Sequence, residues 1–140
     1  MQTMPDSSEF ASLAEMLESK DLKTDEIIAM IEESSYEDLV KPSSVLKSTL
    51  LHLAAYRNMP DVVKLLLNKL KYEDLIVKDF WGSTSFHEAT KCGSAEIVKL
   101  LMDRLEYKDL IETSGVCKVI PLHLALYHNK IDVVKLLLNK

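Results

Sequence analysis

Three copies of one segment follow each other in this chain, and this repetition restricts its fold more than any other feature of the sequence. Each copy contains a histidine, and these are His52, His87 and His123. A second marker, a Tyr-x-Asp-Leu segment, begins at Tyr36, Tyr72 and Tyr107. The histidines lie 35 and 36 residues apart, and the tyrosines 36 and 35. Two independent markers with one period indicate an array of repeats, in which each unit buries its apolar side against its neighbours.

Each copy has the pattern of two short helices. In the first copy, Thr49 stands before the apolar run 50–55, where its hydroxyl can satisfy free N–H groups. Asn58 predicts the turn between the helices, and Pro60 fits the first position of the second helix, where no N–H is needed. The apolar residues of 62–67 form the predicted buried face of that helix. The fold class is therefore all-α, a solenoid of helix pairs.

Before the three copies lies a diverged one. We expect residues 1–7 to be disordered, as termini usually are. Residues 8–40 predict a helix from about Ser8 and a second helix capped by Thr24, which runs into the segment 36–40. The outer face of this first helix is polar, which suits the end of a repeat stack. Residues 8–40 are therefore interpreted as an N-terminal helical cap.

The three full units occupy residues 41–140, at about 41–76, 77–111 and 112–140. The last residues, 136–140, belong to the second helix of the third unit, and no polar closing unit follows in this sequence. A repeat array normally covers such an apolar end. We therefore expect this C-terminal face to be covered by further repeats or by self-association with another chain.

The repeated motif resembles the ankyrin repeat. It reads Thr49-Leu-Leu-His-Leu-Ala-Ala55, Thr84-Ser-Phe-His-Glu-Ala-Thr90 and Ile120-Pro-Leu-His-Leu-Ala-Leu126, each followed by a run such as Val62-Val-Lys-Leu-Leu-Leu67. The resemblance implies helix pairs with a projecting hairpin loop before each pair. The units depart from the family in length. Segments such as 70–76 replace the usual Gly-Ala, and they predict a longer second helix followed by a turn whose Leu and Ile fold back onto the stack.

The resemblance also implies where a partner binds. Ankyrin-like stacks present a concave face built from the hairpin tips and the exposed side of each first helix. Carried over position by position, these residues are Leu46, Tyr56, Arg57, Phe80, Trp81, Lys91, Val116, Tyr127 and His128. Aromatic residues and arginine are favoured at binding hot spots, and Trp81 is the first candidate. The alternative is that Phe80 and Trp81 pack between adjacent hairpins.

Catalysis, metals and cofactors find no support in the sequence. Zinc needs its ligands about 2.0–2.3 Å from one ion, whereas neighbouring helices pack about 8–10 Å apart, so one histidine per unit cannot converge on a metal. We interpret these histidines as structural, bonded to loop backbone between units. Cys92 and His87 are five residues apart and do not share a helix face. We expect no enzyme and no cofactor.

The predicted function is a non-catalytic module that binds a protein or peptide, as a scaffold or adaptor. The alternatives are the interaction domain of a larger enzyme, channel or signalling protein, and a small inhibitor of an enzyme. The net charge of −5 argues against a nucleic-acid partner. No apolar run approaches the roughly 20 residues that cross a bilayer, so we expect no membrane insertion. Two cysteines and a polar N-terminus lead us to expect a cytoplasmic protein, with the nucleus as the alternative.

Overall fold

The computed structural model describes residues 13–19, 22–44, 46–92, 94–115 and 118–139. Within these ranges the backbone is helical apart from turns, loops and one isolated antiparallel bridge between Ser114 and Val119. The helices are α1 (Leu13–Ser19), α2 (Thr24–Glu33), α3 (Tyr36–Val40), α4 (Leu50–Tyr56), α5 (Pro60–Lys69), α6 (Tyr72–Leu75), α7 (Ser85–Cys92), α8 (Ala95–Met102), α9 (Tyr107–Leu110), α10 (Pro121–Tyr127) and α11 (Ile131–Leu138). The predicted all-α solenoid is confirmed.

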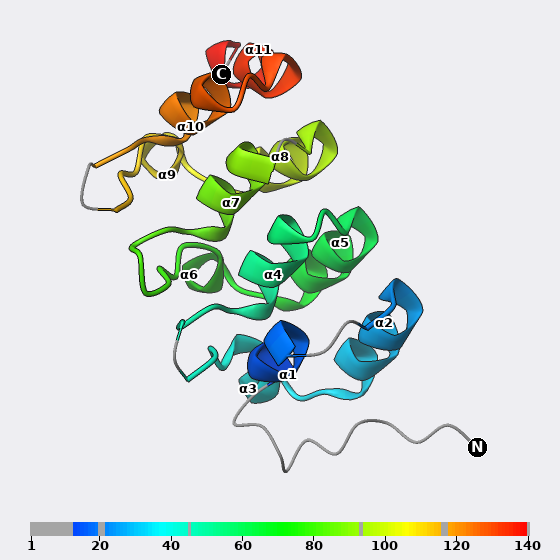
Figure 1. Cartoon of the computed structure of the whole chain (residues 1–140). Coiled ribbons are helices and arrows are strands. Elements are labelled where there is room, and N and C mark those ends of the chain that lie inside the picture. Colours follow the sequence, from blue (N-terminus) through cyan, green and yellow to red (C-terminus); the bar gives the residue numbers. More distant parts are fainter. Residues whose placement is uncertain (1–12, 20–21, 45, 93, 116–117, 140) are drawn as a thin grey trace.

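The helices form two parallel layers (Figure 1). In the first layer α4 packs between α1 and α7, and α10 packs on α7. In the second layer α5 packs between α2 and α8, and α11 packs on α8. The short helices α6 and α9, with the loops that lead to α7 and α10, lie on the side of the first layer that faces away from α5 and α8. Each unit is thus a helix pair with a loop projecting from it.

The local sequence sets where the helices begin. The hydroxyl of Thr49 accepts from the N–H of His52 (3.3 Å), and that of Ser94 accepts from Ile97 (3.3 Å). Pro60 stands at the start of α5, as the sequence predicts, and Pro121 stands at the start of α10. Asn58 has a φ of 57°, which ends α4 with the left-handed residue that a tight turn needs. The cap predicted at Thr49 and the turn predicted at Asn58 are confirmed.

Small side chains allow the first layer to pack closely. Ala54, Ala89 and Ala125 hold the same position in α4, α7 and α10, two residues after the motif histidine, and all three are fully buried. Phe86 of α7 and Leu51 of α4 are buried beside them. The second layer contributes branched residues such as Val63 and Leu66, also fully buried. One continuous core therefore runs along the stack.

Two predicted helix extents are wrong. The second helix of the first unit is not longer than usual: α5 ends at Lys69, Leu70 adopts an extended conformation, and a separate short helix, α6, follows. Helix α6 starts anew because the carboxylate of Asp74 accepts from the N–H of Lys71 (2.8 Å). The burial of Leu75 confirms that this segment folds back onto the stack.

The N-terminal unit needs the same correction. Helix α2 ends at Glu33, and α3 is a separate helix whose cap is Ser35, which accepts from the N–H of Asp38 (3.3 Å). Thr24 is the first residue of α2 rather than its cap, because the preceding Lys23 donates its N–H to the Glu26 carboxylate (3.1 Å). The predictions for residues 1–7 and for a helix start near Ser8 lie outside the described residues.

Three projecting loops, called fingers 1, 2 and 3 here, span residues 43–48, 79–83 and 114–119. Each is closed by a backbone hydrogen bond, from Ser43 to Ser48 (2.8 Å), from Asp79 to Ser83 (2.9 Å) and from Ser114 to Val119 (2.8 Å). Each also contains a residue of positive φ, at Lys47, Gly82 and Lys118. Neighbouring fingers are joined where Phe80 donates its N–H to Leu46 (2.8 Å) and Gly115 donates to Trp81 (3.0 Å). The fingers therefore form a connected row.

Candidate partner-binding site

The motif histidines hold neighbouring units together. Nε2 of His52 lies 2.8 Å from the carbonyl oxygen of Ser83, and Nε2 of His87 lies 2.7 Å from that of Glu112. In each ring Nδ1 accepts from the N–H of the threonine before the helix, Thr49 or Thr84, so Nε2 carries the proton and donates to the carbonyl. Burial lowers the pKa of both rings and keeps them neutral. The structural interpretation is confirmed for these two histidines.

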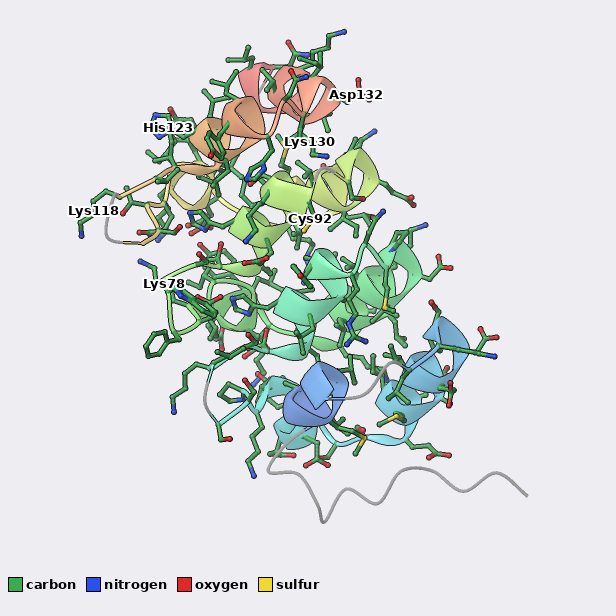
Figure 2. All side chains as sticks on the ribbon, viewed as in Figure 1. Lys78, Cys92, Lys118, His123, Lys130 and Asp132 are labelled. Atoms are coloured by element: carbon green, nitrogen blue, oxygen red, sulfur yellow. The ribbon has the colours of Figure 1, made fainter. Side chains whose placement is uncertain are left out.

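His123 and Cys92 do not build a reactive centre in the described structure. The His123 ring is exposed, and its Nδ1 accepts from the N–H of Ile120 (3.3 Å). Figure 2 shows His123 on the finger side of α10, away from Cys92 at the end of α7. Burial raises the pKa of the Cys92 thiol, which favours its unreactive protonated form. Within the described ranges no three histidine, cysteine or acidic side chains gather as a metal site would require.

A hollow of about 380 Å³ lies between α4, α7 and finger 2 on the concave side. This hollow, called the central hollow below, combines aromatic, charged and small polar side chains. Its lining residues are Ser48, His52, Leu53, Tyr56, Asp79, Trp81, Ser83, Glu88 and Lys91. The hollow therefore brings together Tyr56 of α4, Trp81 of finger 2 and Lys91 of α7.

Its aromatic walls are accessible to a partner. Trp81 is 55 % exposed, Tyr56 is 59 % exposed, and Phe80, the neighbour of Trp81 in finger 2, is 69 % exposed. The rings of Phe80 and Trp81 meet edge to face, with centroids 5.7 Å apart and planes at 84°. Their backbones join the fingers, while more than half of each side chain stays open to solvent. Exposed large aromatics next to a hollow mark a candidate contact surface.

Two carboxylates line the same hollow. Asp79 holds finger 2 in shape, because its Oδ1 accepts from the N–H groups of Trp81 and Ser83, each at 3.0 Å. The Glu88 side chain is only 14 % exposed, and its Oε2 lies 3.7 Å from the ammonium of Lys91. Burial, with a smaller contribution from the charge of Asp79, raises the pKa of Glu88. The hollow thus contains a carboxylate that has lost much of its hydration.

The other candidates are spread along the face. Arg57 donates from Nη2 to the carbonyl oxygen of Leu17 (2.5 Å), so its guanidinium also ties α4 to the end of α1. Leu46 is half-buried in finger 1, where its carbonyl accepts from Phe80. Tyr127 and His128 are exposed at the end of α10 with ring centroids 5.0 Å apart. Val116, like Val45 and Cys117, lies outside the described residues.

The sequence reasoning missed Glu88 and Asp79. A signal for Glu88 was present: it follows the motif histidine directly, where the other two copies have Leu53 and Leu124. A charged residue that replaces an apolar one in a single copy indicates a local function. Asp79 carries no such signal, since its place in the hollow depends on the shape of finger 2.

Comparison with protein families agrees with the repeat architecture. The family model described as ankyrin repeats, three copies, matches residues 26–114 and, in an overlapping match, residues 51–140. The chain belongs to the ankyrin repeat family. Ankyrin repeats are in general protein–protein interaction modules, and they are typically non-catalytic.

A search of curated proteins gives no match to this ankyrin chain. Among the residues described, none of the helices has the length and apolar character needed to cross a bilayer.

Proposed function

We propose that this ankyrin chain is a scaffold or adaptor that binds a protein or peptide on its concave face, with the central hollow at the middle of the contact. The observation that carries the proposal is the exposure of Trp81 and Tyr56 in the lining of one hollow, with the exposed ring of Phe80 in contact with Trp81. Hot spots of protein interfaces are enriched in tryptophan and tyrosine and lie near the centre of the contact. The membership of the chain in a family of interaction modules supports the same function.

The rigidity of the surface also supports binding. The tip of finger 2 is fixed by backbone bonds to fingers 1 and 3, and Asp79 fixes its turn. A preformed surface loses little conformational freedom when a partner binds, which leaves more of the contact energy for affinity. The concave face is therefore suited to a partner that presents an extended segment or a loop.

The test is quantitative affinity capture with a matched pair of variants. Trp81→Ala should leave the helical circular dichroism intact and weaken binding of the partner by more than about 1 kcal/mol, the hot-spot scale. Lys99→Ala, on the exposed outer face of α8, is the control. Proteins retrieved by the wild type and by Lys99→Ala but lost with Trp81→Ala are partners of the concave face. If every retrieved protein binds Trp81→Ala equally well, the proposed site is wrong.

A further inference from the structure

Glu88 sets the central hollow apart from the other units of the stack. The equivalent residues of α4 and α10 are Leu53 and Leu124, and an apolar residue suits this position next to the buried histidine. A carboxylate there is largely removed from water, which costs free energy unless a positive partner compensates it. Lys91 compensates only in part, because its Nζ is 3.7 Å away and its side chain is 41 % exposed.

The charge of the hollow is unbalanced. Asp79 and Glu88 contribute two carboxylates, and Lys91 is the one lining residue with a permanent positive charge. His52 does not add a second, because its Nε2 proton is engaged by the carbonyl of Ser83 and its buried ring stays neutral. Oδ2 of Asp79 accepts no hydrogen bond from the rest of the described chain, whereas Oδ1 accepts two. Oδ2 of Asp79 can therefore still accept a hydrogen bond, and the residues that line the hollow carry more negative than positive charge.

The remaining walls suit a flat cation. Trp81 and Tyr56 line the hollow together with Glu88, and a cation over the face of tryptophan or tyrosine is attracted by the ring. A guanidinium stacks on aromatic faces and gives a carboxylate two parallel hydrogen bonds, which a lysine ammonium cannot do. A volume of about 380 Å³ is at the lower end of the range for ligand pockets, about 300–1,000 Å³. The hollow accommodates one long side chain rather than a folded segment.

We propose that the central hollow receives an arginine side chain of the bound protein, with its guanidinium on the Glu88 carboxylate and flanked by Trp81 and Tyr56. This inference rests on the proposed function, since it specifies the chemistry of a partner on the same face. The arginine adds to the partial compensation that Lys91 gives to the Glu88 carboxylate in the free protein. The second unit, in which Glu88 stands where the other units have leucine, thereby determines which partner segment is bound.

The experiment uses a displayed library of random peptides selected on the immobilised 140-residue protein. Peptides whose binding is weakened by Trp81→Ala should have an arginine in common. The arginine of one such peptide is then replaced by citrulline, which keeps its shape and removes its charge, and by lysine. We expect citrulline to weaken binding at least about tenfold, and lysine to weaken it by less, because lysine keeps the charge without the paired hydrogen bonds. These changes leave the protein, and hence its folding, untouched.

On the protein side, Glu88→Gln should weaken the arginine peptide at least about tenfold and should abolish the difference between arginine and citrulline. Glu96→Gln is the matched control, because Glu96 is an exposed carboxylate of α8 that pairs with Lys64 on the outer face. If no selected peptide depends on Trp81, the proposed function itself fails. If peptides depend on Trp81 but contain no arginine, or bind Glu88→Gln as tightly as the wild type, the arginine proposal is overturned and the binding face remains.

Discussion

At the scale of single residues, the aspartates of the second and third Tyr-x-Asp-Leu segments, Asp74 and Asp109, each perform two tasks. Oδ2 of Asp74 accepts from the N–H of Lys71 at the start of α6 and from the hydroxyl of Tyr36 in the preceding unit (2.6 Å). Asp109 repeats both contacts, with Glu106 and with Tyr72 (2.5 Å). The bond to Asp74 raises the pKa of Tyr36 to about 12. The second sequence marker therefore recurs because it starts a helix and joins two units.

This link gives a matched pair of substitutions. Tyr72→Phe removes the hydrogen bonds to Asp109 and Glu106, whereas the exposed hydroxyl of Tyr107 makes none to the described residues. We expect Tyr72→Phe to lower the midpoint of urea unfolding and Tyr107→Phe to change it by less than half as much, because only the first loses a bond to a charged acceptor. Equal midpoints for the two variants would contradict the linking role.

The buried histidines make stability depend on pH. Their folded pKa lies below the ordinary 6.5, so the unfolded chain binds more protons as the solution becomes acidic. Their contribution to stability is complete above about pH 6.5 and is lost as the pH falls below that value. Each ring can steepen the loss by at most about 1.4 kcal/mol per pH unit. Urea unfolding at pH 7.5, 6.5 and 5.5 measures the loss.

The control for this prediction is the double variant His52→Gln and His87→Gln. Glutamine can still donate to the carbonyls of Ser83 and Glu112 but does not titrate, so the pH dependence should become shallower. Glu88 acts in the opposite direction, because its raised pKa favours the folded state at acid pH. A double variant with the same slope as the wild type would assign the pH dependence to other groups.

At the scale of elements, the sequence was sufficient where local chemistry decides. Thr49, Asn58 and Pro60 set the ends of α4 and α5 through contacts within a few residues, and these predictions are confirmed. The break between α5 and α6 does not follow from helical spacing, because spacing does not register the cap that Asp74 gives to the N–H of Lys71. The burial of Leu70 and the bond from Tyr36 in another unit to Asp74 add long-range contacts at the same break.

In the candidate site, too, some features were predictable from the sequence and others depend on packing. The resemblance to ankyrin repeats placed Tyr56, Trp81 and Lys91 on one face, and the structure brings them to one hollow. Glu88 was missed because helical spacing treats it as one polar position among others. Its burial arises only when α7 and finger 2 pack beside α4. Whether the residues of the face bind a partner stays a prediction, which the capture experiment tests.

Finger 2 owes its shape to Gly82, which has a φ of 79°. A methyl group added there would meet the N of Gly115 at 3.5 Å, an ordinary contact, so conformation rather than space is the obstacle. Gly82→Ala should lower the free energy of unfolding by about 1 kcal/mol, the cost of a left-handed conformation for a residue with a side chain. Chemical denaturation followed by circular dichroism measures the change.

The same position in finger 3 offers the control. Lys118 has a φ of 57° and already carries that conformational cost. Lys118→Gly relieves it, so this substitution should not lower the free energy of unfolding. If Gly82→Ala is as stable as the wild type, the backbone of finger 2 is not held in its left-handed turn in solution.

At the scale of the whole molecule, the stack is best packed in its middle. Leu67 of α5 and Met102 of α8 are 6 % and 7 % exposed, whereas Leu138, the equivalent residue of α11, is 68 % exposed. A hollow of about 270 Å³ at this end is lined by apolar residues of α9, α10 and α11, among them Leu110, Leu122 and Leu137. That this face is covered by further repeats or by another chain stays a prediction.

In such a stack each unit is stabilised mainly by its direct neighbours. Leu101 of α8 and Leu137 of α11 hold equivalent positions, but Leu101 is fully buried between layers and Leu137 only half-buried. We expect Leu101→Ala to cost about 2–5 kcal/mol of unfolding free energy, the range for a buried leucine. Leu137→Ala should cost less than half of that, because it removes contacts on one side only.

Amide hydrogen exchange should accordingly be fastest in α11 and slowest in α4 and α7, since local opening begins where fewest apolar contacts must break. Protection of α11 equal to that of α7, independent of protein concentration, would show that the described contacts underestimate how firmly this end is held.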